Sequence, residues 1–379
     1  MVNSLDLALQ RSKYKHLTDD EWRWFLQQVE GRERTADKLP TFASIPDWWY
    51  PVRLSCEQCS SELAARYKAE IITPYTLHHT PSTMVDLTGG YGVDTYFLSE
   101  QFAHTDYVEQ NEELCRIAAH NFANKPISIH NTTAEDFLKT AGQYDLIYLD
   151  PARRDSHGGK VFRLEDCTPN VVELLPTLLS HGKRLMIKLS PMLDLTQALL
   201  HLTPYTVHLS WDIYVVAIKN EVKELLLLSG GSGHITAIDL AQKGQAFVFT
   251  REEEQNCQLV NGKCPNGKWL YEPNSAILKA GAYKLVAQRF GLHKLDINTH
   301  LYCSDQLVEN FPGRVWKIVE KQDLKQANVL TRNYPLTPEA LKKKLHLRDG
   351  GTAFVIGCRV AGKPTLFFAE RIEDIHTEG

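Results

Sequence analysis

Apolar residues follow two different spacings along the chain, and the change between them divides it into regions. In its first part apolar residues recur at helical spacing between Trp22 and Val29, and the segment Thr18–Glu21 ahead of them is a capping-box pattern. From about residue 81, short apolar runs alternate with amphipathic segments, which is typical of strands and helices in an α/β domain. We therefore expect a helical region over residues 1–80 and an α/β domain over residues 81–232.

The apolar runs of the second region predict its strands. The run Tyr144–Asp150 is nearly continuous, as expected for a strand that is covered on both faces of its sheet. Strands are expected at residues 84–86, 105–108, 127–131, 144–150, 184–188, 211–218 and 224–228, the last two as a hairpin. Helices are expected at residues 55–72, 94–102, 112–124 and 168–179. This alternation predicts a Rossmann-like α/β sheet.

The pattern changes again in the last third of the chain. We expect an added β element or linker at residues 233–262, in which Glu252–Glu254 has the composition of a solvated turn. One helix at residues 275–290 follows. Strands at residues 315–320, 328–332 and 352–369, with a helix starting near Leu336, then predict a small α+β C-terminal domain.

The segment Met84–Asp94 combines a strand, a glycine-rich turn and the start of a helix. This combination is typical of a nucleotide-binding unit. Its glycines allow positive φ angles and a close approach of the backbone to a ligand. The same pattern serves two cofactors, the nicotinamide dinucleotides and S-adenosylmethionine.

The acids of this segment favour S-adenosylmethionine. A dinucleotide fingerprint on Gly90–Thr95 puts Thr95 where a small residue is needed. It also puts Asp94 at the helix start, where a carboxylate competes with a pyrophosphate. An ammonium group suits Asp86 and Asp94 better, and Glu109, after the next strand, can accept hydrogen bonds from ribose hydroxyls. We therefore expect S-adenosylmethionine as the cofactor.

Residues 84–154 resemble the class I S-adenosylmethionine-dependent methyltransferases. The motifs are D-x-x-G-G-x-G-x-D after the first strand, an acid after the second, T-A-E-D after the third and D-P-A-R after the fourth. Together with Glu57–Glu62, Ile187–Met192 and Arg332–Thr337, the D-P-A-R-R run is similar to bacterial members that carry a ferredoxin-like segment and a THUMP-like domain. The resemblance implies that fold and that cofactor.

The resemblance also sets domain boundaries and candidate residues. It implies a ferredoxin-like segment at residues 263–311 and a THUMP-like domain at residues 312–379. The candidate cofactor-binding residues are Asp86, Thr88, Gly89, Gly90, Gly92, Asp94, Glu109, Gln110, Ala134, Glu135 and Asp136, with the last three near adenine. The candidates that face the methyl acceptor are Asp150, Pro151, Arg153 and Arg154.

Asp150 is the central candidate for chemistry. The fourth strand adjoins the first in this fold, so Asp150 should project beside the sulfonium, where it can accept a hydrogen bond from a target N–H. Pro151 stiffens the turn, and Arg153 stands where amino-group methyltransferases of the D/N-P-P-aromatic kind carry an aromatic residue. The alternative role of Asp150 is a helix cap. Transfer to a uridine C5 atom needs a nucleophilic cysteine, but Cys115 lies on the predicted helix after the second strand and Cys167 is in no recognisable motif, so we do not favour this chemistry.

Composition limits the functional classes. With 379 residues, 43% of them hydrophobic and 23% charged, the chain is an ordinary globular protein of two or three domains. It contains no run of 18 or more apolar residues and begins without a secretory pattern, so we expect a cytoplasmic protein without a membrane segment. Cys56 and Cys59 form a C-x-x-C pair without a second such pair, so we expect no metal site.

Charge is distributed unevenly and favours RNA as a partner. Residues 81–232 hold 12 Lys and Arg against 19 Asp and Glu, whereas residues 263–379 hold 18 against 12. A basic appendage on an acidic catalytic unit is the expected arrangement when the appendage binds a polyanion. Lys342–Lys344, beside Arg332 and Arg348, are the candidate phosphate contacts.

The leading hypothesis is a methyltransferase that acts on a base nitrogen of structured RNA, such as tRNA or rRNA. Two alternatives stay open at this point. One is a small-molecule methyltransferase whose C-terminal region only shapes the pocket. The other is a non-catalytic RNA-binding or assembly protein on a methyltransferase scaffold.

Overall fold

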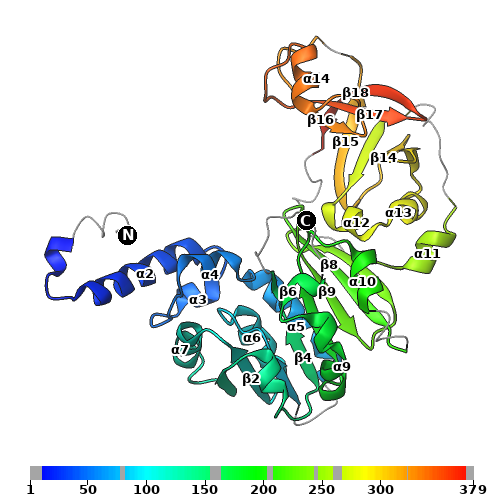
Figure 1. Cartoon of the computed structure of the whole chain (residues 1–379). Helices are drawn as coiled ribbons and strands as arrows, with labels where there is room; N and C mark the ends of the chain where they lie inside the picture. Colours follow the sequence, from blue (N-terminus) through cyan, green and yellow to red (C-terminus); the bar gives the residue numbers. More distant parts are fainter. Residues whose placement is uncertain are drawn as a thin grey trace. The chain divides into compact units, whose positions relative to one another are not determined.

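The computed structural model describes residues 11–76, 82–153, 164–202, 208–242, 246–258, 267–321 and 323–372 (Figure 1). The chain divides into two compact units. The first comprises Met1–Trp211 with Leu226–Gly231, and the second comprises Asp212–Leu225 with Ser232–Gly379. Across the described ranges, every helix is too short or too polar to span a membrane.

The described part of the N-terminal region is helical, as the sequence predicts. Its elements are η1 (Arg11–Tyr14), α2 (Asp19–Thr35), α3 (Pro40–Ser44), α4 (Arg53–Gln58) and α5 (Glu62–Thr76). The predicted capping box is present, because the Thr18 side chain accepts from the Glu21 N–H while Glu21 bonds the Thr18 backbone. The single helix predicted at residues 55–72 is wrong. The chain is extended at Cys59, which separates α4 from α5 and frees Ser60 to bond Asp94.

A parallel sheet forms the middle of the first unit. Its strands are β1 (Thr83–Asp86), β2 (His104–Glu109), β3 (Ile127–Asn131), β4 (Leu146–Leu149) and β7 (Leu185–Leu189). Val85 of β1 lies opposite Asp106 of β2 on one side and Ile147 of β4 on the other. The predicted neighbourhood of the first and fourth strands is therefore confirmed. The complete sheet has nine strands in the order β11-β10-β8-β9-β7-β4-β1-β2-β3.

Short connections and helices join these strands. They are α6 (Val93–Leu98), η2 (Ser99–Gln101), α7 (Glu112–Asn121), α8 (Ala134–Leu138), β5 (Ala152–Arg153), η3 (Leu164–Asp166), β6 (Cys167–Thr168), α9 (Val171–His181) and α10 (Leu195–Leu202). Helix α10 was not expected from the sequence. The glycine-rich stretch after β4, Asp155–Lys160, lies outside the described residues.

An aromatic cluster joins the N-terminal helices to α6 and α7. Phe42 and Trp48 stack with ring centroids 4.0 Å apart, and both are buried against Tyr91, Phe97 and Phe122. The aromatic residues of this cluster therefore anchor the N-terminal helices in the core. Because Tyr91 belongs to the glycine-rich turn, the helical region packs directly on that turn.

The second unit begins with the remaining strands of the nine-stranded sheet. These are β8 (Trp211–Ile218), β9 (Glu221–Ser229), which runs on into the first unit, β10 (His234–Asp239) and β11 (Phe247–Thr250). Lys219 and Asn220 have positive φ angles at the β8–β9 turn, as a tight hairpin requires. The solvated turn predicted at Glu252–Glu254 is wrong, because these acids form the first turn of α11 (Arg251–Asn256) behind a Thr250 capping box.

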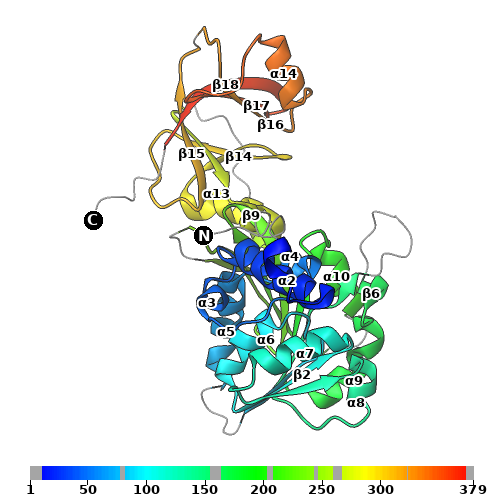
Figure 2. The same cartoon turned by 90° about the vertical axis from the view of Figure 1, so that its left-hand side faces the viewer.

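A seven-stranded sheet fills the rest of the second unit (Figure 2). Its strands, in the order β13-β14-β12-β15-β18-β17-β16, are β13 (His293–Asp296), β14 (Thr299–Ser304), β12 (Trp269–Pro273), β15 (Gly313–Val319), β18 (Lys363–Arg371), β17 (Ala353–Val360) and β16 (Asn328–Arg332). Its helices are α12 (Ser275–Ala280), α13 (Tyr283–Phe290) and α14 (Pro338–Lys344). The single helix predicted at residues 275–290 is wrong, because Gly281 adopts a φ of 84° and ends α12.

Candidate active site

The candidate site lies at the carboxyl ends of the parallel strands β1, β2 and β4. There the structure has a cavity of about 320 Å³ in the first unit. Its walls come from the glycine-rich turn, the ends of β2 and β4, the start of α8 and the α4–α5 connection. The lining residues are Ser55, Gln58, Cys59, Ser60, Asp86, Leu87, Thr88, Gly89, Gly90, Tyr91, Gly92, Val93, Asp94, Glu109, Gln110, Leu114, Thr132, Thr133, Ala134, Glu135, Tyr148, Asp150, Ala152, Thr168 and Pro169.

The glycine-rich turn needs its glycines for two reasons. A Cβ atom at Gly89 would lie 2.2 Å from the Tyr107 ring, so only glycine allows this close approach. Gly92 adopts a φ of 82° where the turn enters α6. The Tyr107 hydroxyl also donates to the Gly90 carbonyl, at 2.5 Å. These contacts shape the floor of the cavity.

Asp86 stabilises the turn from beneath. Its Oδ1 accepts from the Thr88 N–H at 2.9 Å, and its Oδ2 accepts from the Thr95 hydroxyl at 2.6 Å. The residue is only 1% exposed. Burial raises its pKa to about 7, although the bonds from Thr95 and Thr88 partly oppose this shift.

Glu109 presents a carboxylate to the cavity wall. Its Oε2 accepts from the Gly90 N–H at 2.9 Å, and its Oε1 accepts from the Asn111 N–H at 2.8 Å. Each carboxylate oxygen has a second lone pair, so Glu109 can still accept two hydroxyl donors. An acid oriented in this way suits a ribose.

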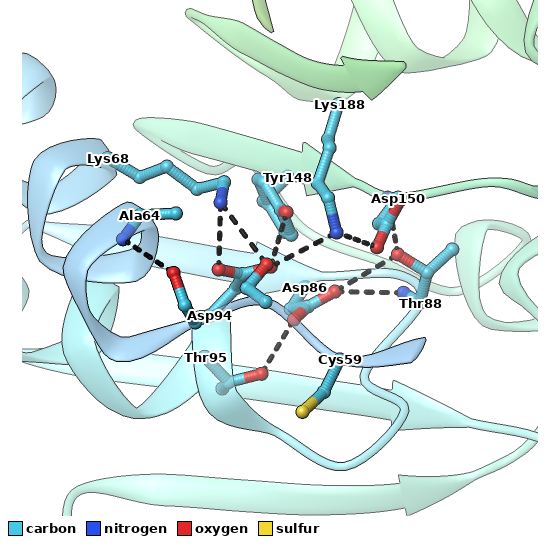
Figure 3. Close-up of polar contacts among 12 residues, drawn as sticks. Cys59, Ala64, Lys68, Asp86, Thr88, Asp94, Thr95, Tyr148, Asp150 and Lys188 are labelled. Atoms are coloured by element: carbon cyan, nitrogen blue, oxygen red, sulfur yellow. Dashed lines mark hydrogen bonds and ion pairs between the residues drawn. The ribbon is translucent and has the colours of Figure 1, made fainter. Parts of the chain in front are cut away.

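Asp94 is buried and surrounded by donors from other elements (Figure 3). Lys68 of α5 lies 3.1 Å from its Oδ1, while Ser60 and Tyr148 donate to its Oδ2 at 2.7 and 2.8 Å. Burial alone would raise the pKa of Asp94, but the charges of Lys68 and Lys188 and the hydrogen bonds from Ser60 and Tyr148 together outweigh burial and lower the pKa. Asp94 therefore lines the cavity as an ionised group that already has partners.

Asp150 lies at the end of β4, where the sequence predicts it. The Thr88 hydroxyl accepts from its backbone N–H at 2.6 Å, which ties the end of β4 to the turn after β1. Lys188, at the end of β7, lies 2.5 Å from Asp150 Oδ2 and 3.8 Å from Asp94 Oδ2 (Figure 3). The structure thus brings the predicted acids of β1, β2 and β4 to one cavity.

Several other predicted site residues do not lie on the cavity wall. Asp136 is exposed, pairs with Lys139 at 2.6 Å and does not line the cavity, whereas Ala134 and Glu135 of the same helix do. Pro151 follows Asp150 but is not on the cavity wall, and Arg153 lies in β5, paired with Cys167 of β6. Arg154 lies outside the described residues.

Sequence reasoning missed several residues of the site. They are Ser60, Lys68, Tyr148 and Lys188, and they come from elements that are distant in sequence from the glycine-rich turn. A signal existed for Lys188, because it is the charged residue of the otherwise apolar strand Leu185–Leu189. A lysine in such a strand needs a buried partner. The partner itself could not be read from the sequence.

The fold and the site define a class I S-adenosylmethionine-dependent methyltransferase, and comparisons with known proteins agree. A protein from Porphyromonas gingivalis W83 whose crystal structure is named as that of a methyltransferase is 32% identical to this chain, with a TM-score of 0.81. The match covers 94% of this chain and 92% of that one. Two proteins from Mycobacterium tuberculosis strains CDC 1551 / Oshkosh and H37Rv, each named as an uncharacterised S-adenosylmethionine-dependent methyltransferase, are 23% identical over 359 residues. That alignment covers 90% of this chain and 94% of theirs.

Family models match the C-terminal part. Residues 269–312 match a ferredoxin-like domain, and residues 313–371 match a domain described as THUMP domain-like. The chain belongs to the family of class I S-adenosylmethionine-dependent methyltransferases that carry these two segments. The sequence-based predictions of fold class, enzyme class and cofactor are confirmed.

Proposed function

We propose that this methyltransferase acts on a nitrogen atom of a base in structured RNA, such as tRNA or rRNA, in the cytoplasm. The observation that carries the proposal is the Asp150 carboxylate, which lies on the cavity wall with its side chain 39% exposed. A carboxylate in this position can accept a hydrogen bond from an amine or ring N–H. The THUMP domain-like match and the basic C-terminal region support RNA as the carrier of that nitrogen.

The cavity suits the cofactor. In the proposal, the turn residues Thr88, Gly89, Gly90 and Gly92 surround the methionyl end with Asp86 beneath them. Glu109 and Gln110 bind the ribose, and Ala134 and Glu135 lie beside the adenine. Asp94 supports this arrangement through Lys68 and Lys188 rather than by binding the cofactor's ammonium group. Asp136, which pairs with Lys139, would contribute only by stabilising α8.

Bound S-adenosylmethionine supplies an electrophilic methyl group, and the protein has to position the acceptor. Asp150 would orient the target N–H and stabilise positive charge that develops on the nitrogen. Pro151 limits the backbone freedom of the turn that carries Asp150. Arg153 and Arg154 are the proposed contacts for the phosphate or the base of the target.

Ion pairs within the C-terminal domain guide our choice of candidate phosphate contacts. Arg332 and Arg314 both pair with the buried Glu272, so Arg332 has a structural role instead of the expected phosphate contact. Lys342 pairs with Asp349 at 2.5 Å. Lys343 and Lys344, which are exposed in the last turn of α14, are the lysines that we propose for phosphate binding.

Calorimetry and labelled-methyl transfer together test the proposal. S-adenosylmethionine should bind the wild-type protein, and Glu109→Ala should weaken binding at least about 10-fold by removing a charge-assisted acceptor. Glu112→Ala, an exposed glutamate that does not line the cavity, is the matched control. Label should then pass to total RNA from cells that lack the gene, and Asp150→Ala should abolish this transfer.

Three results would contradict the proposal. Transfer of label only to a small-molecule extract would establish a small-molecule methyltransferase. RNA binding that persists in Asp150→Ala, without transfer by the wild-type protein, would favour a scaffold. Equal loss of cofactor affinity in Glu109→Ala and Glu112→Ala would remove the role of Glu109.

A further inference from the structure

Lys188 is a charged residue at the end of an apolar strand, inside the candidate site. Its side chain is 12% exposed, and its neighbours Ile187 and Leu189 in β7 are buried. An ammonium group in such surroundings loses hydration and is stable only with charged or hydrogen-bonding partners. Its partners include the carboxylates of Asp150 and Asp94, at 2.5 and 3.8 Å (Figure 3).

Asp94 is itself firmly placed. Lys68, with a fully buried side chain, approaches it from α5, and the hydroxyls of Ser60 and Tyr148 donate to its Oδ2. The charges therefore alternate in the order Lys68, Asp94, Lys188 and Asp150, a set that we call the charge chain. Its members come from α5, α6, the end of β7 and the residue after β4. Each buried charge in it lies beside an opposite one.

The outer end of the charge chain is the proposed target-binding group. Asp150 is the most exposed member, with 39% of its side chain exposed, compared with 10% for Asp94 and 12% for Lys188. Lys188 bonds Asp150 Oδ2, and a target N–H would bond Oδ1. An ammonium on one oxygen thus restricts rotation of the carboxylate and directs the other oxygen.

We propose that Lys188 is a positioning residue of the methyl-transfer site, which orients the Asp150 carboxylate toward the target N–H and is itself anchored by Asp94 and Lys68. This inference rests on the proposed function of Asp150. It also gives Asp94 a role that cofactor binding alone does not explain. Lys188 acts through Asp150 and is not itself a catalytic residue.

Three variants separate positioning from general stability. Lys188→Met keeps the length of the side chain and removes its charge, and Lys188→Arg restores the charge. Lys183→Met is the matched control. Lys183 lies just before the other end of β7 and pairs with Asp145 at 2.7 Å, so Lys183→Met removes a lysine–aspartate pair away from the site, at a more exposed side chain. Thermal unfolding shows which variants fold.

Kinetics give the first readout. Lys188→Met should bind S-adenosylmethionine within about 3-fold of wild type, while kcat with total RNA falls about 10- to 100-fold, because misplacement by an ångström is enough to cost that much. Lys188→Arg should recover most of kcat, and Lys183→Met should match wild type. A kcat within 2-fold of wild type for Lys188→Met (about 0.4 kcal/mol), or an equal kcat loss in Lys183→Met, would overturn the inference.

Crystal structures with S-adenosylhomocysteine give a second readout that needs no methyl acceptor. In Lys188→Met the Asp150 carboxylate should change its rotamer or become disordered, while the cofactor product and the turn keep their positions. An Asp150 side chain unchanged in Lys188→Met would overturn the inference whatever the substrate is. If wild-type protein binds S-adenosylmethionine but methylates no RNA, the proposed substrate fails, and this comparison still decides the role of Lys188.

Discussion

At the scale of single residues, Asp86 shows how burial changes the chemistry of an expected ligand. The sequence places an acid before the glycine-rich turn, and the structure buries it to 1% exposure with bonds to Thr88 and Thr95. Loss of hydration raises its pKa from 3.8 to about 7. The group that shapes the turn therefore titrates near neutral pH.

This shift predicts a pH-dependent stability difference between wild type and Asp86→Asn. Between pH 3.8 and about 7, native Asp86 keeps a proton that the unfolded chain has lost. Its stabilising contribution is therefore complete below 3.8 and is lost as the pH rises through about 7. The free energy of unfolding of wild type relative to Asp86→Asn should fall by at most about 1.4 kcal/mol per pH unit in this window.

Urea unfolding of both proteins at several pH values checks this expectation. Asp136→Asn is a suitable control. The hydrogen bond and charge of Lys139 lower the pKa of the exposed Asp136 carboxyl, so the contribution of Asp136 to the free energy of unfolding changes with pH in the opposite direction. A difference between wild type and Asp86→Asn that does not change with pH would show that the Asp86 pKa is not raised.

At the scale of elements, the N-terminal helices complete the wall of the candidate cofactor site. The Trp48 indole N–H donates to the Tyr91 hydroxyl at 2.9 Å, and that hydroxyl donates to the Trp49 carbonyl at 3.3 Å. The α4–α5 connection adds Cys59 and Ser60 to the cavity wall. The helical region thus acts as one wall of the site.

We expect Trp48→Phe to weaken S-adenosylmethionine binding several-fold. The substitution leaves the buried Tyr91 hydroxyl without its donor, at a cost of about 1–3 kcal/mol, part of which should loosen the glycine-rich turn. Calorimetry on Trp48→Phe, Tyr91→Phe and the double variant measures the coupling. If the losses of binding free energy in the two single variants add up to the loss in the double variant, Trp48 and the turn are not linked as we expect.

At the scale of the whole molecule, the chain combines a methyltransferase sheet with a basic C-terminal part. The ferredoxin-like and THUMP domain-like matches cover residues 269–312 and 313–371. Their sheet packs against α14 through Leu341, which contacts a cluster that includes Val329 and Val355. Leu341 is thereby buried, whereas Lys343 and Lys344 in the last turn of α14 are exposed.

Charge reversal at these lysines should weaken RNA binding without affecting the cofactor. For Lys343→Glu with Lys344→Glu, we expect the slope of log affinity against log salt to become less steep by about 1–2, since each phosphate contact contributes about 0.7–0.9. Filter binding of total tRNA at several salt concentrations measures this. The control is Lys139→Glu with Lys223→Glu. It changes the net charge by the same amount, at exposed lysines that are already ion-paired. An identical slope change in this control would indicate a general charge effect.

Much of the first unit follows from local sequence. Strand β3 and the capping box before α2 occur where the sequence predicts them, because alternation and capping depend on nearby residues. The predictions failed where tertiary contacts decide the backbone. The break at Cys59, for example, brings Ser60 to Asp94. Gly281 is a different case, because a glycine helix cap is a local signal that the prediction of one helix overlooked.

The sequence by itself determined the class of protein, since the glycine-rich turn, the acids after successive strands and the D-P-A-R motif are local patterns with direct chemical meaning. Only the tertiary structure decided which charges meet. Lys68, Asp94, Lys188 and Asp150 span 121 positions of the chain and pair because sheet order and helix packing bring their side chains together. Such ion pairs depend on distances of a few ångströms, which no spacing along a chain specifies.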